Sequence, residues 1–326
     1  MPQLLMIALA GFAAQMVDGS LGMGYGVTSA SILLAVGVAP SLVSATANIA
    51  QLGTTLTSGL AHHRGGNVDM QVLGRLAIPG GVGGLAGALL LTALPSDVTT
   101  PIMAGILTVL GARVILRFLR GRTRAADEAT APPLGSWHPG WLMPLGAVGG
   151  AVNAVGGGGW GPVVTSALLT AAPLPPRRVI GTVSAAEFVV TVCATLGFLV
   201  GLGLGGIDYP IVLALLLGGV LAAPLAARLA GRLPAPVLGV AVGSLILALN
   251  LPTLLGTLGV GEGLTAGVQL GLIGLGLVLI ALVAVRLRVQ RGRDQGEERG
   301  SETRSAGARR AEEPSAGQSS GRRVAP

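Results

Sequence analysis

The sequence has no lysine, a single cysteine and few charged residues of either sign. With only Cys193, the chain has no internal disulfide framework and no cysteine-based metal cluster, and apolar neighbours favour a buried, unreactive thiol. Charged residues make up 11% of the 326 residues, whereas a soluble domain carries about 25%. An ordinary soluble domain is therefore excluded.

The chain is rich in long runs of apolar residues. Hydrophobic residues make up 51% of the chain, and a helix of about 20 apolar residues spans a bilayer. We expect full-length crossings at Ser41–Ala61, Val72–Leu94, Val98–Leu116, Arg178–Leu202, Tyr209–Leu229, Val237–Leu251 and Thr265–Val285. The sequence thus predicts an all-α polytopic protein in a lipid bilayer.

The basic residues are all arginines, and they indicate how the chain is oriented in the membrane. They number 21 and give a net charge of +7, of which +4 lies in residues 286–326. Most of the others flank apolar segments, as arginines do in cytoplasmic loops, so we expect no nucleic-acid partner. The apolar N-terminal segment lacks a basic start, and we expect it to belong to the mature protein rather than to a signal peptide.

Two stretches of the chain resemble each other. "DGSLGMGYGV" at 18–27 aligns with "NAVGGGGWGP" at 153–162, and "VSATANIAQ" at 43–51 aligns with "VIGTVSAAE" at 179–187. These alignments pair Asp18 with Asn153, Gly22 with Gly157, Gly24 with Gly159, Tyr25 with Trp160, Gly26 with Gly161, Thr46 with Thr182, Asn48 with Ser184 and Gln51 with Glu187. The chain therefore reads as two related halves.

The arginine clusters alternate in a way that makes these halves inverted. The alternation holds if each glycine-rich break enters and leaves the membrane on one side, which gives each half a re-entrant helix pair and three crossings. We expect a first transmembrane repeat at 1–119, a cytoplasmic linker at 120–139, a second repeat at 140–252, an extra helix at 253–285 and a disordered cytoplasmic tail at 286–326. The N-terminus then lies outside a cytoplasmic membrane and the C-terminus inside.

The glycine-rich breaks are the candidate site. Non-helical backbone at membrane depth is tolerated only where it is buried in protein or lines a cavity. The helices that restart after Gly19–Gly24 and Gly156–Gly159 begin with free N–H groups and a positive dipole end, which together attract an anion. The alternative is that the glycines only allow close helix packing.

Four segments resemble the TauE/SafE family of sulfite-exporter-like permeases: "DGSLGMGYGV", "SGLAHHRGGNVD", "GGGGWGPVVTSALL" and "RRVIGTVSAAEF". The resemblance spans roughly residues 11–251, and the doubled histidine at 62 and 63 departs from the pattern at one position. It implies a membrane permease, not an enzyme, for small sulfur-containing or organic anions such as sulfite, sulfoacetate or thiosulfate.

The residues expected to bind such an anion lie at the breaks and at matched polar positions: Gly22, Gly24, Tyr25, Thr46, Asn48, Gly157, Gly158, Gly159, Trp160, Thr182 and Ser184. The alternatives are hydrogen bonds between helices for the polar side chains and aromatic packing for Tyr25 and Trp160. His62 and His63 are expected to be solvated at a helix end. No metal or cofactor is expected.

Two carboxyls are candidates for proton coupling. Glu187 lies inside a predicted crossing, where an ionisable group is a functional candidate by default. A carboxyl bonded to a neighbouring hydroxyl is the alternative. Asp18 lies at a break, where it is equally suited to cap the restarting helix.

The function expected from these features is secondary transport of small anions, coupled to protons through the two carboxyls. The sequence has no P-loop, so ATP drive within this chain is not expected. An anion channel is one alternative. A second is an intramembrane hydrolase built on Ser20, which lacks a histidine in a predicted crossing to activate it. Substrate, direction, coupling ion and oligomeric state stay open.

Overall fold

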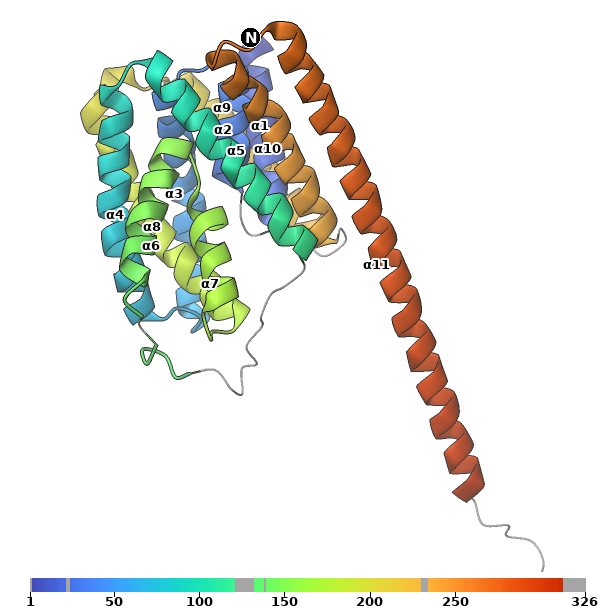
Figure 1. Ribbon diagram of the computed structural model, residues 1–326. Coiled ribbons are helices and arrows are strands. Elements are labelled where there is room, and N and C mark those ends of the chain that lie inside the picture. The colour runs from blue at the N-terminus through green and yellow to red at the C-terminus, as the bar shows by residue number, and fades with distance from the viewer. Residues whose placement is uncertain (1, 22–23, 121–131, 138, 230–233, 313–326) are drawn as a thin grey trace, which may run out of the picture. The chain divides into compact units, whose positions relative to one another are not determined.

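The computed structural model describes residues 2–21, 24–120, 132–137, 139–229 and 234–312, and these ranges contain helices and no strands. The all-α fold class is thereby confirmed (Figure 1). Residues 1–280 form one compact unit and 281–326 a second. The elements are α1 (Pro2–Leu21), α2 (Tyr25–Ala35), α3 (Pro40–Arg64), α4 (Met70–Ala93), α5 (Ser96–Arg120), α6 (Leu142–Gly156), the π-helical η2 (Gly161–Thr165), α7 (Ser166–Ala171), α8 (Pro176–Leu202), the 3₁₀ turn η3 (Leu204–Gly206), α9 (Tyr209–Leu229), α10 (Ala235–Thr257) and α11 (Glu262–Glu312).

Six helices within the described ranges are long and apolar enough to cross a membrane: α4, α5, α8, α9, α10 and α11. They coincide with six of the seven crossings expected from the sequence. The seventh, α3, has 25 residues but is more polar. Its buried polar side chains include Ser44, Asn48 and Gln51, which lower its hydropathy. A crossing by α3 stays a prediction.

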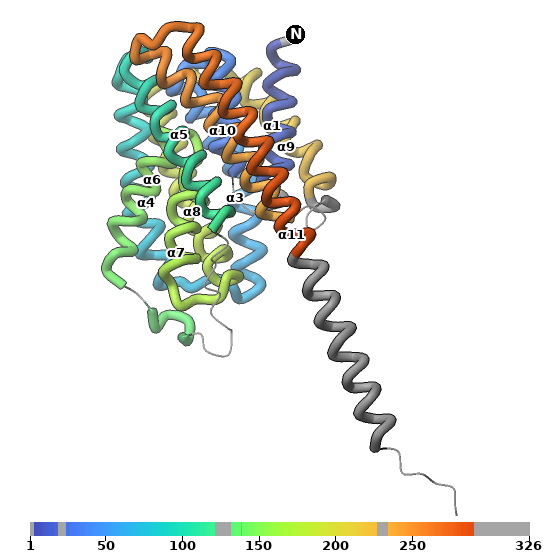
Figure 2. The backbone as a smooth tube through the Cα atoms, turned by 45° about the vertical axis from the view of Figure 1, so that its right-hand side comes forward, coloured from blue at the N-terminus to red at the C-terminus, as the bar shows by residue number. Residues whose placement is uncertain are grey.

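Helical structure is interrupted at both predicted glycine-rich positions. α1 ends at Leu21 and α2 begins at Tyr25, while α6 ends at Gly156 and helical structure resumes at Gly161. Each broken segment packs against a helix of the other predicted half. α1 lies against α9, and α6 lies against α4. α5 and α10 run side by side (Figure 2). This packing is compatible with related halves, and their inverted orientation stays a prediction.

Several glycines outside the breaks allow two helices to touch. A Cβ on Gly11 or Gly218 would run into a backbone carbonyl across the α1–α9 contact, and one on Gly146 or Gly150 would do so between α6 and α4. Small residues allow this close approach in membrane proteins generally. These glycines outside the breaks therefore serve helix packing.

The structure describes part of the stretch after Val285, where a disordered tail is expected from the sequence. In the structure α11 continues to Glu312, and the Glu, Gln, Arg and Ala residues of this stretch are strong helix formers. Residues 313–326 lie outside the described part of the chain, as do 121–131 and 138 of the predicted linker. The predicted domain boundaries otherwise stay predictions.

Candidate functional site

The two breaks meet inside the protein. Gly24, Gly157 and Gly158 have φ angles of +115°, +69° and +147°. Residues other than glycine rarely adopt φ angles in this region. A Cβ on Gly26 would collide with the backbone of Gly158, and one on Gly158 with the backbone of Gly26. Glycine is thus needed here both for backbone conformation and for direct contact between the two halves.

The helices that restart after the breaks have matching caps. The Tyr25 amide donates to Asp18 Oδ1 at 3.4 Å, and the Trp160 amide donates to Asn153 Oδ1 at 3.3 Å. Each bond joins two residues seven positions apart. The repeat pairs the two acceptor residues with each other and the two donor residues with each other. The structure therefore places Asp18 as a helix cap, which was one of its two expected roles, while its carboxylate also lines a cavity.

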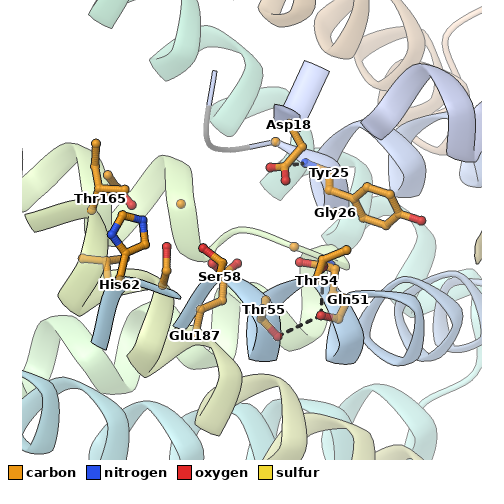
Figure 3. Close-up of a pocket in the computed structure, with 16 residues that line it drawn as sticks. Asp18, Tyr25, Gly26, Gln51, Thr54, Thr55, Ser58, His62, Thr165 and Glu187 are labelled. Carbon is orange, nitrogen blue, oxygen red and sulfur yellow. Dashed lines mark hydrogen bonds between the residues drawn. The ribbon is translucent and has the colours of Figure 1, made fainter. Parts of the chain in front are cut away.

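This cavity has a volume of about 220 Å³ and lies between the two broken segments, α3 and α8 (Figure 3). Its lining combines backbone of both breaks with hydroxyl, amide, carboxyl and imidazole groups. The lining residues are Asp18, Gly24, Tyr25, Gly26, Gln51, Thr54, Thr55, Ser58, His62, Gly158, Gly161, Thr165, Ile180, Val183, Ser184 and Glu187.

The structure brings six of the predicted site residues into this lining: Asp18, Gly24, Tyr25, Gly158, Ser184 and Glu187. Of α3, Thr46 and Asn48 were predicted to bind the anion, whereas the α3 residues that line the cavity lie further along the helix and were not among the predicted binding residues. Gln51, Thr55, Ser58 and His62 recur at intervals of three or four residues and so share one face of that helix. That spacing was visible in the sequence and was a usable signal.

Other predicted site residues lie outside the lining and have structural contacts instead. Asn48 Oδ1 accepts a hydrogen bond from Asn153 Nδ2 at 3.0 Å. Trp160 is fully buried, and its Nε1 donates to the Val183 carbonyl at 3.1 Å. Their contacts match the packing alternative.

Four more predicted site residues do not line the cavity either. Thr182 Oγ1 accepts the Asp69 amide at 2.9 Å, and Thr46 is buried. Gly157 and Gly159 belong to the break and are buried. Gly22 lies outside the described residues.

Besides one phenol, the ionisable groups in the described lining of the cavity are two carboxyls and an imidazole, without a guanidinium. Asp18 and Glu187 line it together with His62, and no arginine of the described chain does so. Glu187 lies in the lining and has no hydrogen bond to a neighbouring hydroxyl among the described residues, and its role in proton coupling stays a prediction. The Arg117 guanidinium donates to Ser166 Oγ at 3.1 Å, one residue beyond the lining.

A third carboxyl group, that of Asp69, lies outside the lining and has a structural role. Asp69 is completely buried and caps α4, its Oδ1 accepting the amides of Gln71 and Val72 at 3.1 Å. Its Oδ2 accepts the Gly135 amide at 2.8 Å. Because its own amide donates to Thr182 of α8, Asp69 ties Gly135 of the predicted linker to the helix that carries Ser184 and Glu187.

Within the described ranges no cluster of three or more His, Cys, Asp or Glu side chains is placed to hold a metal ion. What the arrangement offers is hydrogen bonding and two ionisable carboxyls. It has the composition of a binding site for a small polar molecule.

Comparison with known proteins agrees with this description. The sequence model of the family "Sulfite exporter TauE/SafE" matches residues 7–253. The chain is 43% identical over 255 residues to the "Probable membrane transporter protein YtnM" of Bacillus subtilis (strain 168), an alignment that covers 78% of this chain and 84% of that protein. No solved structure matches the chain.

Proposed function

The chain belongs to the sulfite exporter TauE/SafE family, and from that premise we propose that this membrane transporter carries small sulfur-containing or organic anions through the cavity between its glycine breaks, with protons bound at Glu187 and Asp18. The family and the relative are transporters, so the hydrolase alternative built on Ser20 is wrong. The resemblance seen in the sequence is confirmed.

The observation that carries the proposal is that the first turns of two half-helices face one cavity. Gly26, in the first turn of α2, and Gly161, at the start of η2, both line it. Amides in a first turn have no partner within the helix and carry the positive end of its dipole. One dipole contributes on the order of 0.3–1 kcal/mol, so two of them attract an anion without trapping it, as a carrier requires.

The two carboxylates argue for proton coupling. An anion in this cavity faces Asp18 and Glu187 with no arginine in the described lining to compensate. Two like charges at 4 Å repel by about 4 kcal/mol at an effective dielectric constant of 20, which exceeds the attraction of both dipoles. Protonation of a carboxyl removes this repulsion, so entry of the anion and uptake of a proton favour each other.

Neutral side chains complete the proposed site. Ser58 on α3 and Ser184 on α8 bring hydroxyl groups to the lining, and Gln51 brings an amide. Such groups donate to an oxyanion and accept from a protonated substrate. They suit a small polar anion better than an apolar molecule.

The test is flux into proteoliposomes that contain the purified protein, with sulfite, thiosulfate and sulfoacetate as substrates. We expect saturable uptake of at least one of them, faster with an inwardly directed proton gradient. Linear, non-saturating flux that ignores the gradient supports the channel alternative. Absence of flux for every member of the panel contradicts the proposal.

The proposed orientation places the N-terminus outside the cytoplasmic membrane and the C-terminus inside it. Arginines of the segments 62–75, 113–124 and 177–178 then share the cytoplasmic side, which is the side of His62 at the end of α3. The proposed cavity accordingly faces the cytoplasm.

A further inference from the structure

A polar stripe follows one face of α3. Ser44, Asn48, Gln51, Thr55 and Ser58 recur at intervals of three or four residues, so they share that face. From Gln51 onward the stripe lines the cavity (Figure 3). The earlier part does not, although its side chains are equally polar and completely buried. The stripe thus has an open part and a closed part.

Hydrogen bonds to the second break close the first part of the stripe. They are Ser44 Oγ to Val155 O at 3.3 Å and Asn153 Nδ2 to Asn48 Oδ1 at 3.0 Å. At the boundary, Gln51 lines the cavity and also donates through Nε2 to Gly157 O at 3.4 Å. The Asn153 bond joins two side chains, and Asn153 also caps the restarting helix at Trp160. Separating α3 from this break therefore requires that the Asn48–Asn153 bond breaks.

Among the described residues, the repeat-paired positions of α8 are not held by such hydrogen bonds to a break. The repeat places Ile180, Ser184 and Glu187 where α3 has Ser44, Asn48 and Gln51. All three α8 residues line the cavity. Ser44 and Asn48 are thus closed off by bonds to a break, whereas Ile180 and Ser184 face the cavity; at the third position both Gln51 and Glu187 face it.

The polar face of α8 also continues past the cavity. Thr191 and Thr195 follow Glu187 at steps of four residues, on the face that carries Ser184. Both side chains are buried, with 0% and 7% of their surface exposed, and neither hydroxyl has a hydrogen-bond partner within the described chain. A buried polar group without a partner is rare in proteins and costly. These hydroxyls therefore point to a second arrangement in which they find partners.

We infer that Asn48, Asn153, Thr191 and Thr195 form the closed half of the transport path. The Asn48–Asn153 hydrogen bond is the latch that keeps it shut. Once the latch opens, the two threonine hydroxyls contact the water and substrate that pass. The inference rests on the proposed transport path through the cavity, but it is independent of the charge of the substrate and of the coupling ion.

The first test asks whether breaking the latch admits water to the closed half. Thr195→Cys is introduced as a reporter into a Cys193→Ala background, and a membrane-impermeant maleimide is applied to the membrane face opposite the cavity. Asn48→Ala should speed labelling of the reporter about tenfold, because losing one net hydrogen bond of about 1.4 kcal/mol shifts a two-state equilibrium by that factor.

Asn250→Ala is the matched control. Asn250 is also a buried asparagine, and its Nδ2 donates to Ser31 Oγ at 2.8 Å, a bond between α10 and α2 outside the proposed path. It should leave the labelling rate unchanged. Equal rates in Asn48→Ala and Asn250→Ala would overturn the assignment of the latch, whatever the protein transports.

The second test uses Thr191→Val, which removes the hydroxyl and keeps the shape. Since this hydroxyl has no partner in the closed state, we expect the melting temperature to be unchanged or higher. We expect the maximal transport rate to fall severalfold, because the open state loses a hydrogen bond. Thr57→Val, on the exposed side of α3, should change neither quantity. Wild-type transport by Thr191→Val would overturn the role given to the threonines.

Discussion

The backbones of Gly26 and Gly158 touch, although 132 residues separate them in the sequence. Each lies beside a helix break, and the breaks belong to different halves of the chain. A cavity with two carboxylates is built around this contact. Since neither glycine has room for a Cβ, the contact ties the shape of the cavity to the identity of both residues.

Gly158→Ala should disrupt the site. The φ of +147° disfavours alanine by about 1–2 kcal/mol, and the added Cβ has to push the backbone of Gly26 away. We expect a lower melting temperature in detergent and a large loss of transport. Gly74→Ala is the control, because nothing lies within 4 Å of a Cβ there. Full transport by Gly158→Ala would show that the contact between the breaks is dispensable.

Glu187→Gln should uncouple transport from protons. The amide keeps the size of the side chain but cannot exchange a proton, so anion flux should lose its dependence on the pH gradient while the protein stays folded. Flux is compared with that of Glu262→Gln, which alters an exposed carboxyl at the start of α11. An unaltered pH dependence in a well-folded Glu187→Gln protein would remove this carboxyl from the mechanism.

Asp69→Ala should destabilise the protein more than it impairs substrate affinity. Loss of a helix cap costs about 0.5–2 kcal/mol, and the Gly135 amide loses its acceptor as well. We expect a clear drop in melting temperature, whereas Asp97→Ala, at an exposed first-turn position of α5, should lower it little. Equal melting temperatures of the two variants would contradict the structural role of Asp69.

The inverted orientation of the halves is tested by labelling. Single cysteines at Asp97 and Ser136, both exposed, are placed in a Cys193→Ala background and treated with an impermeant maleimide. Position 97 should react from outside and position 136 only after the membrane is opened. Reaction of both positions from the same side contradicts the predicted topology.

Local physical rules explain what could be predicted from the sequence. Four consecutive glycines in an apolar run weaken a helix, so the break at Gly156–Gly159 was predictable. The repeat pairs Asp18 with Asn153, and each of them lies seven positions before the aromatic residue at which a helix restarts. This pattern in the sequence indicates two matching caps.

Which candidate residues line the cavity depends on which helices pack against each other. Local sequence rules do not predict that packing. Thr182 looked like a substrate ligand until the structure placed its hydroxyl against the Asp69 amide from a distant part of the chain. Asn48 was matched with Ser184, yet only the serine lines the cavity. Equivalent positions of the repeat have different surroundings in the fold, and the sequence alone does not show which of the two faces the cavity.

The central claim is that an anion and a proton move together through the cavity at the glycine breaks. Simultaneous measurement of thiosulfate uptake and luminal pH in proteoliposomes tests it most directly. Thiosulfate is the anion of a strong acid, so it carries no proton of its own near neutral pH. We predict saturable uptake that acidifies the lumen in the wild type and does not acidify it in Glu187→Gln. Thiosulfate uptake by the wild type without any change in luminal pH would contradict the account.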